Sequence, residues 1–358
     1  MNQGFWSGKR VFLTGHTGFK GGWLAVWLKS LGARVTGYSL AASTNPSFFE
    51  LCRVAEGLES VTGDVRDLDS LARTLRASRP EIVLHLAAQP LVRRSYQQPV
   101  ETMASNIMGT VHLLEAARQS PGVRAILVIT SDKCYRIRPT PEGYREEEPM
   151  GGRDPYSASK GCAELVSAAY QHSFFRDSGA AIATARAGNV IGGGDWSEDR
   201  LVPDAIRALA SGAVLRVRNP HSVRPWQHVL EPLSGYLVLA ERLFEDPAQW
   251  QGGWNFGPGD ADAVPVSDLS DLLVHAWGDG ARWQHTGEPR APHEEPYLKL
   301  NSGKARQLLG WHPRLNIAEA VDWAVSWYRR AMDPASDMAG LSRAQIREYQ
   351  QRMDSAQS

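Results

Sequence analysis

The feature that most constrains the fold of this chain is a glycine-rich loop between a predicted strand and a predicted helix. Residues 10–14 form a short apolar run, and residues 23–31 repeat apolar side chains at helical spacing. The loop between them consists of Gly15, His16, Thr17, Gly18, Phe19, Lys20 and Gly21. In such a unit the first glycine allows a tight turn, the second admits a pyrophosphate and the third lets helix and sheet pack closely. The loop therefore predicts a dinucleotide site at the start of the helix.

Strands and helices continue to alternate after this unit, which predicts an α/β fold with a Rossmann-type, doubly wound parallel sheet. Buried strands are expected at 33–38, 82–86, 125–129 and 181–186, and helices at about 100–118 and 156–175. Beyond residue 188 the alternation weakens, and arginine and tryptophan side chains accumulate. We expect a cofactor domain over 1–188, a smaller α/β substrate-binding region over 189–333, of which about 226–250 packs back on the first domain, and a peripheral polar tail over 334–358.

Further candidates for contact with a dinucleotide lie at later strand ends and on the next helix: Asp64, Val65, Ala87, Ala88, Gln89 and Asn106. Asp64 could accept a hydrogen bond from an adenine amino group, or it could simply cap the following helix. The two alanines would let a cofactor approach the backbone. The second strand ends without an acidic residue for a ribose 2′-hydroxyl and without an arginine for a 2′-phosphate, so this position does not distinguish NAD from NADP.

A polar cluster directly follows the buried strand at 125–129. Ser131, Asp132 and Lys133 stand there together, and ligands of open α/β sheets bind at the carboxyl ends of the strands. Serine and aspartate are also ordinary turn residues, so the cluster alone does not establish a site.

Tyr156 and Lys160 are four residues apart and share one face of the helix predicted at 156–175. An ammonium group beside a phenol is expected to lower the pKa of Tyr156 towards a range useful for proton transfer. Ser131 could then bond the substrate oxygen from which Tyr156 takes a proton, while Lys160 also holds the nicotinamide ribose. The order of these motifs suits hydride transfer between a sugar alcohol carbon and NAD.

The bulk properties of the chain exclude several classes of partner. Its formal net charge is zero, which gives no electrostatic case for binding nucleic acid or an anionic membrane. We find no cleavable signal and no apolar stretch of about 18 residues. Cys52, Cys134 and Cys162 are scattered without metal-ligand spacing, so we expect reduced thiols, no metal site and a cytoplasmic protein.

The motifs resemble those of the extended short-chain dehydrogenases/reductases that modify nucleotide sugars, and the resemblance covers nearly the whole chain. Its signatures are the segments 15–21, 63–65, 87–89 and 156–160. Within that family the chain is most similar to the 4,6-dehydratases that act on CDP-glucose. The discriminating stretches are the residues from His16 to Lys20 within the glycine loop and the segments 131–135, 186–196 and 224–229.

The resemblance implies an internal redox reaction in which bound NAD oxidises carbon 4 of CDP-glucose and is regenerated when carbon 6 is reduced. Tyr156 would take the proton of the 4-hydroxyl. Asp132 would protonate the departing 6-hydroxyl, for which it must hold a proton near neutral pH. The resemblance also implies a homodimer or a dimer of dimers, paired through the helices near 100–118 and 156–175. Around the nucleotide diphosphate it implies Asn189, Arg200, Leu201, Arg224 and Tyr297.

Lys133 departs from the pattern of the similar dTDP-glucose dehydratases, which carry a glutamate there as the base at carbon 5. We expect Lys133 to take this base role, which requires that desolvation or the charge of Lys160 favour its neutral form. The alternative is that Lys133 stabilises the enolate while another group, such as a Tyr156 phenolate, removes the proton.

Two other functions remain open. The first is another enzyme on the same scaffold: a different nucleotide-sugar dehydratase, an epimerase or a decarboxylating reductase. Asp132 and Lys133 argue against simple 4-epimerisation, which needs no acid-base pair to eliminate water. The second is a cofactor-sensing regulatory protein without catalysis, since fold alone does not fix function. The intact set of Ser131, Tyr156 and Lys160 argues against it.

Overall fold

The computed structural model describes residues 2–138, 140, 142–287 and 298–355. Its centre is a seven-stranded sheet in the order β11-β6-β5-β4-β1-β2-β3, in which every pair of neighbours is parallel. The strands are β1 (Arg10–Thr14), β2 (Arg34–Ser39), β3 (Glu59–Thr62), β4 (Ile82–His85), β5 (Ala125–Ile129), β6 (Ala181–Arg186) and β11 (Gly252–Asn255). The predicted α/β fold of Rossmann type is confirmed, and β11 is a strand that the sequence did not predict.

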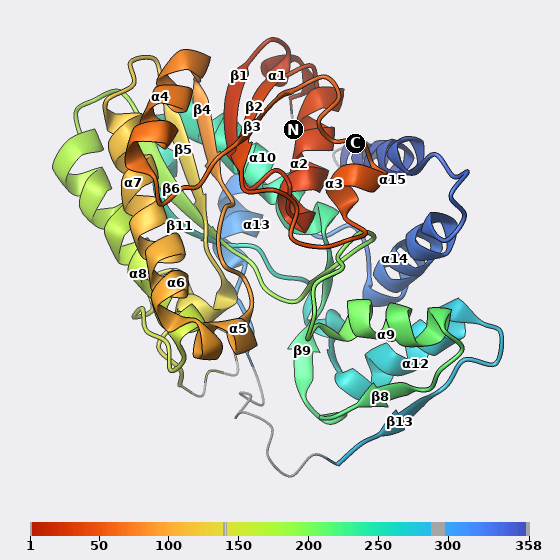
Figure 1. Ribbon diagram of the computed structural model, residues 1–358. Coiled ribbons are helices and arrows are strands. Elements are labelled where there is room, and N and C mark those ends of the chain that lie inside the picture. The colour runs from red at the N-terminus through yellow and green to blue at the C-terminus, as the bar shows by residue number, and fades with distance from the viewer. Residues whose placement is uncertain (1, 139, 141, 288–297, 356–358) are drawn as a thin grey trace.

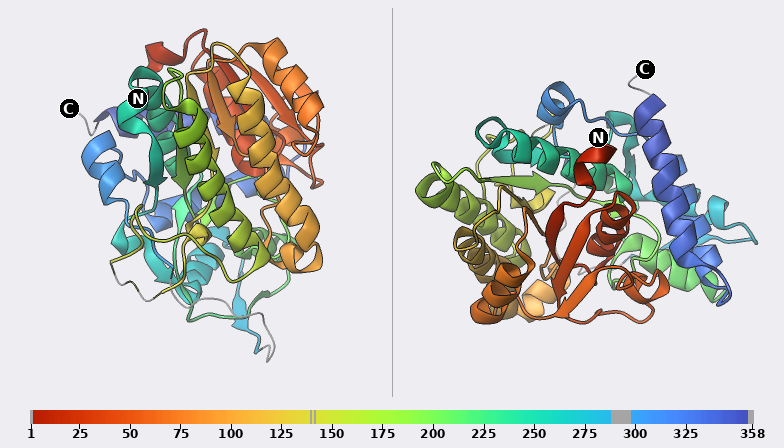
Figure 2. Two further views of the ribbon diagram at one scale, coloured as in Figure 1. Left: turned by 90° about the vertical axis from the view of Figure 1, so that its left-hand side faces the viewer. Right: turned by 90° about the horizontal axis from the view of Figure 1, so that it is seen from above.

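Helices cover both faces of this sheet (Figure 1; Figure 2). On one face lie α4 (Leu68–Ser78), α7 (Gly109–Arg118) and α8 (Pro155–Tyr170), and on the other lie α2 (Phe19–Ser30) and α10 (Leu230–Glu245). Because successive side chains of a strand point to opposite faces, neighbouring strand residues belong to different cores. Leu127 packs in the core beneath α2 and α10, whereas Ile126 and Val128 pack beneath α4, α7 and α8.

Two of the predicted helices contain a π-helical turn. The helix expected at 100–118 consists of α6 (Pro99–Met103), a π turn (Ala104–Met108) and α7. The helix that starts with the Tyr156 segment consists of α8 followed by a π turn (Gln171–Phe175). Such turns re-aim the side chains of a helix, and the first of them carries Asn106.

A smaller α/β region lies beside the sheet (Figure 1). It contains α9 (Leu201–Ala210), β8 (Leu215–Val217), β9 (Val223–Pro225), β12 (Ala263–Pro265), α12 (Val266–Trp277) and β13 (Trp283–His285). The chain returns to the main sheet through α10, which packs on β5 and β6. The division into domains at residue 188 stays a prediction. The other elements are α1 (Gln3–Trp6), α3 (Phe48–Leu51), α5 (Val92–Gln97), β7 (Val190–Ile191), β10 (Gln227–His228), α11 (Pro247–Trp250), α13 (Gly303–Leu309), α14 (Ile317–Ala331) and α15 (Met338–Ser355).

The C-terminal segment is not the peripheral tail that its polar composition suggested. Helix α15 packs against α2, and its Tyr349 is fully buried. The ring of Tyr349 meets that of Trp27 edge-on at 5.8 Å, and its hydroxyl donates to Glu231 Oε2 at 2.5 Å. A narrow stripe of apolar side chains on a mostly polar helix is enough to anchor it to the core.

No helix in the part of the chain that the structure describes combines the length and the apolar character needed to cross a bilayer.

Candidate active site

Ser131, Asp132 and Lys133 lie at the carboxyl end of β5, where they begin a short 3₁₀ turn. The Ser131 side chain caps this turn by accepting a hydrogen bond from the backbone N–H of Lys133 at 3.2 Å. Its hydroxyl donates to Asp132 Oδ1 at 2.8 Å. We call residues 131–134 the Ser131 turn. The capping bond fixes the serine and aspartate side chains relative to each other.

The carboxylate of Asp132 is buried, with only 2% of the residue exposed. Its Oδ1 lies 4.0 Å from the Lys133 ammonium, and its Oδ2 has no hydrogen-bond partner among the described residues. A Cβ atom at Gly188 would lie 2.0 Å from that Oδ2, so the carboxylate occupies space that only a glycine leaves. Because a buried polar oxygen without a partner is costly, Oδ2 marks a place for a ligand hydroxyl.

Lys133 is the least buried residue of the Ser131 turn. A third of its side chain is exposed, so it is only partly desolvated. Its ammonium lies 4.0 Å from the carboxylate of Asp132, and the two side chains form an ion pair.

Tyr156 and Lys160 project from the first two turns of α8, whose N-terminus is capped by Asp154. Both side chains are buried. The Lys160 ammonium donates to the carbonyl of Ile129 at 3.1 Å. Burial lowers the pKa of Lys160 to about 8, although the charge of Glu164 acts in the opposite direction. Lys160 therefore loses its charge as the pH rises through about 8.

The expected lowering of the Tyr156 pKa is wrong in this structure. Burial raises the pKa of Tyr156 to about 12, while a hydrogen bond with Ser131 and the charge of Arg200 only partly offset this. Ser131 and Arg200 are thus the groups that lower the pKa of the Tyr156 phenol against the effect of burial. A phenol with this pKa is present as the phenolate base in only a small fraction near neutral pH.

The glycine loop fits a dinucleotide. Gly15 has a φ of +79°, and a Cβ there would lie 2.7 Å from the backbone nitrogen of Ala87. A Cβ at Gly21 would lie 2.0 Å from the Gly15 carbonyl oxygen. Gly18 is the N-cap of α2, and no side chain bonds the N–H groups of the first turn. A Cβ at Gly18 would lie 3.4 Å from its nearest neighbour, the Gly15 carbonyl oxygen. The first N–H groups of α2 are therefore left for an anion such as a pyrophosphate.

The four other residues of the loop point in different directions. The His16 ring is buried against Gly37 and bonds Ser60 Oγ through Nε2 at 2.8 Å. Burial lowers its pKa to about 4, so His16 is a neutral core residue. Thr17 bonds Ser39 Oγ at 2.7 Å, at the end of β2.

Phe19 and Lys20 face the other side of the loop. A Cβ at Gly192 would lie 3.2 Å from the Phe19 ring, so this ring reaches the segment after β7. Burial lowers the pKa of Lys20 to about 8, as does the charge of Arg200, while Asp132 raises it. Lys20 thus lies in the electrostatic field of the Ser131 turn.

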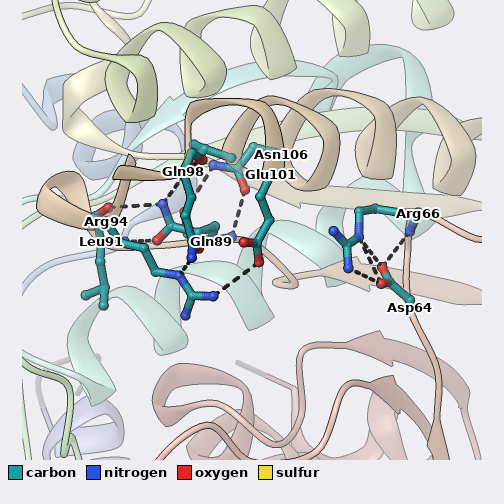
Figure 3. Close-up of polar contacts among 9 residues, drawn as sticks. Asp64, Arg66, Gln89, Leu91, Arg94, Gln98, Glu101 and Asn106 are labelled. Atoms are coloured by element: carbon teal, nitrogen blue, oxygen red, sulfur yellow. Dashed lines mark hydrogen bonds and ion pairs between the residues drawn. The ribbon is translucent and has the colours of Figure 1, made fainter. Parts of the chain in front are cut away.

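Asp64 is held by its neighbour Arg66 in a bidentate pair, with Arg66 Nη2 2.6 Å from Asp64 Oδ2 (Figure 3). This pairing lowers the pKa of Asp64. The alternative that Asp64 caps the next helix is wrong, because Asp67 caps α4 by accepting from the Ser70 N–H at 3.0 Å. Val65 packs on Gly109 of α7.

Asn106 bonds Gln89 just after β4 (Figure 3) and also reaches α8. Its Oδ1 accepts from the Gln89 N–H at 2.8 Å, and its Nδ2 donates to the Gln89 carbonyl at 3.1 Å and to Ser159 Oγ at 2.8 Å. The segment of Ala87 and Ala88 is thereby fixed relative to Tyr156. The amide of Asn106 is fully engaged within the protein, so it acts as a brace.

Arg200 is the predicted substrate residue that the structure brings nearest to this chemistry. It donates to the buried Asp195 Oδ2 at 3.2 Å, and its charge acts on both Tyr156 and Lys20. Leu201 begins α9 next to it. Asp195 was not predicted to have a role, although it precedes Arg200 by only five residues.

Two other predicted substrate residues are described by the structure: Asn189, directly before β7, and Arg224 on β9. Asn189 adopts a φ of +50°, and its buried Nδ2 has no partner among the described residues; the same is true of the indole N–H groups of Trp196 and Trp226. Arg224 lies on β9 and donates to the Val223 carbonyl at 2.9 Å. Tyr297 lies outside the described residues.

Sequence reasoning also missed the buried ion pair of Glu164 and Arg186 behind the Ser131 turn. A signal was present, because Glu164 follows Lys160 by four residues and therefore lies on the same helix face. Within the described ranges, no cluster of three or more histidine, cysteine or acidic residues could hold a metal ion.

Comparisons with known proteins agree with this geometry. The model of the NAD dependent epimerase/dehydratase family matches residues 11–251. The CDP-glucose 4,6-dehydratase of Salmonella typhimurium is 52% identical over 354 residues, which are 98% of each chain. The dTDP-glucose 4,6-dehydratase of Streptomyces antibioticus is 29% identical over 75% of this chain and 76% of its own.

Solved structures share the fold. A UDP-glucose-4-epimerase from Stenotrophomonas maltophila, with bound NAD and formylated UDP-arabinopyranose, superposes with a TM-score of 0.80 at 23% identity, covering 92% of this chain and all of its own. A dTDP-glucose 4,6-dehydratase double mutant from Streptomyces venezuelae, with NAD bound, gives a TM-score of 0.76 at 24% identity, covering 89% of this chain and 97% of its own.

Proposed function

Because the chain belongs to the NAD dependent epimerase/dehydratase family, we infer that it catalyses the 4,6-dehydration of CDP-glucose. The products are CDP-4-keto-6-deoxyglucose and water, which places the enzyme in deoxysugar biosynthesis. The observation that carries this proposal is the Asp132–Lys133 pair beside Tyr156 and Ser131. Elimination of water needs an acid and a stabilised enolate, whereas exchange of configuration at carbon 4 needs neither.

The enzyme uses NAD. We propose that the glycine loop, the backbone of Ala87 to Gln89 and the Lys160 ammonium hold it. When bound, NAD supplies the redox chemistry, carrying hydride from carbon 4 of the sugar to carbon 6. The remaining steps of the reaction are proton transfers, which side chains of the protein carry out.

We propose that the proton of the 4-hydroxyl passes from Tyr156 through Ser131 to Asp132. The Ser131 hydroxyl lies close enough to the Tyr156 phenol to lower its pKa, and it donates to Asp132 Oδ1 at 2.8 Å. Asp132 starts as a carboxylate paired with Lys133 and becomes a carboxylic acid. Tyr156 acts as the phenolate, which is the minor form near neutral pH because burial raises its pKa, and it returns to the phenolate once it has passed the proton on. Asp132 then gives this proton to the departing 6-hydroxyl, which leaves as water. Tyr156 takes the proton of carbon 5 and returns it there when carbon 6 is reduced, so both side chains end as they began.

In this scheme Lys133 stabilises the enolate and remains an ammonium group throughout. We prefer this role to the base role expected from the sequence, because Lys133 forms an ion pair with Asp132 at 4.0 Å and a third of its side chain is exposed. We further propose that Arg200, held by Asp195, binds the diphosphate together with Arg224. Asn189, Leu201 and Tyr297 complete the substrate set.

Incubation of the enzyme with CDP-glucose and NAD should yield a 4-keto sugar, which is measured by its absorbance in alkali. The dTDP, UDP and GDP analogues serve as matched controls and should react at least about tenfold more slowly, because pockets that hydrogen-bond a base reject partners lacking the right groups. A faster reaction of another nucleotide sugar would overturn the substrate assignment but keep the reaction. No keto sugar from any of them would contradict the proposed function.

We propose that the enzyme forms a homodimer, or a dimer of dimers, through α6 to α8. Large apolar side chains are exposed on these neighbouring helices: Val100 on α6, Met108 on the first π turn, Leu165 on α8 and Phe174 on the second π turn. Val100 is 81% exposed and Leu165 is 60% exposed. A second copy that covers this face would bury all four side chains in a bundle of helices.

Replacing Val100 and Leu165 together by glutamate should convert the dimer to a monomer, because four like charges would then face each other in the interface. Sedimentation analysis measures the mass. Leu308→Glu is the matched control, since Leu308 is 59% exposed on α13, away from this face. A monomeric native enzyme, or a double variant that stays dimeric, would contradict this interface.

We propose a cytoplasmic location. All three cysteines are free thiols, as expected of a protein kept in a reducing compartment.

A further inference from the structure

A buried ion pair lies behind the Ser131 turn. Glu164 is on α8, one helical turn after Lys160, and Arg186 ends β6. Arg186 Nε donates to Glu164 Oε1 at 2.9 Å, and Arg186 Nη2 donates to Glu164 Oε2 at 2.8 Å. Only 5% of either side chain is exposed. Neither residue has a role in the chemistry described above.

This ion pair holds the residue at each end of the Ser131 turn. Thr130 directly precedes the turn, and its hydroxyl donates to Glu164 Oε1 at 2.5 Å. Tyr135 directly follows it, and its hydroxyl accepts from Arg186 Nη1 at 2.5 Å. The residues on both sides of the Ser131 turn are therefore hydrogen-bonded to the same Glu164–Arg186 ion pair.

The pair is itself fixed by several elements. Thr184 of β6 donates to Glu164 Oε2 at 2.6 Å. Tyr135 donates onward to Asn255 Oδ1 of β11 at 2.7 Å, and Arg186 Nη1 also donates to the Glu146 carbonyl at 3.0 Å. A charge pair satisfied on this many sides cannot shift without leaving a buried group unpaired, which is strongly unfavourable.

We infer that the Glu164–Arg186 pair is a positioning element. It fixes the positions of Ser131 and Asp132 through Thr130, and the position of Lys133 through Tyr135. Tyr156, Lys160 and Glu164 all lie on α8, whereas Arg186 ends β6, so the pair couples the turn to the helix that carries Tyr156. A shift of about 1 Å between reacting groups can cost about 10²-fold in rate. This inference rests on the proposed function only for the substrate used in its test.

Thr130→Val should lower kcat about 10- to 100-fold and change KM less than about threefold, because it frees the Ser131 end of the turn. Thr184→Val is the matched control: it removes a hydroxyl of the same kind from the same carboxylate, but at a residue that does not adjoin the turn. It should lower kcat less than about threefold. Thermal unfolding should show similar losses of stability in both variants. Thr130→Ser retains the hydroxyl and should restore kcat.

Tyr135→Phe should act on the other end of the turn. It should slow deuterium exchange at carbon 5 about tenfold more than it slows oxidation at carbon 4, because Lys133 acts on the enolate. Tyr144→Phe is the control, since the Tyr144 ring stacks on Tyr135 at 4.9 Å while its hydroxyl bonds the backbone of Arg138 instead. It should leave this ratio unchanged.

Equal losses of kcat in Thr130→Val and Thr184→Val would overturn the inference, since the hydrogen bonds would then serve stability alone. So would an unchanged ratio of exchange to oxidation in Tyr135→Phe. These comparisons hold for whichever nucleotide sugar the native enzyme turns over. If the native enzyme turns over none, the proposed function fails before the variants are compared.

Discussion

Replacing Asp132 by asparagine should let the enzyme oxidise carbon 4 of CDP-glucose and then stop. Asparagine matches the shape of aspartate but can neither take the proton that Ser131 passes on nor protonate the 6-hydroxyl. Loss of a general acid costs about 10²- to 10⁴-fold, so formation of the 6-deoxy product should fall by that factor. Oxidation should stay within about tenfold of the native rate, because the Tyr156 phenolate can keep the proton of the 4-hydroxyl when residue 132 cannot receive it. The near-ultraviolet absorbance of reduced nicotinamide should therefore rise and persist.

Asp195→Asn is the control for Asp132→Asn, because it also neutralises a buried carboxylate in the same cleft. Asp195 holds Arg200 at 3.2 Å, so its loss should raise KM for CDP-glucose without any persistent absorbance. Two results would contradict the role of Asp132. One is product formation by Asp132→Asn within about tenfold of the native rate. The other is equal loss of oxidation and elimination.

Lys133→Met and Lys133→Arg should differ sharply in the deuterium exchange of carbon 5. If Lys133 stabilises the enolate by its charge, methionine should lower the exchange about 10²- to 10³-fold, the usual cost of losing one stabilising group. Arginine keeps the positive charge but cannot act as a base near neutral pH, so it should retain exchange within about tenfold.

Oxidation of carbon 4 measured in the same samples is the internal control for the lysine variants. It should be little affected, since the partly exposed Lys133 is a neighbour of Asp132 rather than of Tyr156 in the hydrogen-bond network. Exchange as low in Lys133→Arg as in Lys133→Met would restore the base role. Normal exchange in Lys133→Met would remove Lys133 from this step altogether.

Much of the fold and part of the site could be predicted because the relevant interactions are local in sequence. Apolar runs of strand length and helical spacing define the alternation of β1, α2 and β2, and a glycine loop has few structural uses in that context. The spacing of Tyr156 and Lys160 guarantees a common helix face. Ser131, Asp132 and Lys133 follow a strand whose carboxyl end must face the cleft.

Other features depend on contacts between distant parts of the chain, which no local pattern encodes. Strand β11 joins the sheet 66 positions after β6 ends, counting from Arg186 to Gly252. Helix α15 reads as polar, yet one buried tyrosine anchors it to Glu231. His16 turns into the core while Lys20 turns towards the Ser131 turn, although both belong to one loop.

The sequence by itself determined the kind of fold and the dinucleotide loop, because these follow from periodicity and spacing, while the roles of Asp132 and Lys133 followed from the family resemblance. Only the tertiary structure decided the charge states and the alignment of those residues. Burial raised the pKa of Tyr156 instead of lowering it, and Asp132 placed a negative charge beside Lys133. In the glycine loop, the spacing of the glycines predicted the loop itself. The directions of its other side chains depended on the residues that pack around them.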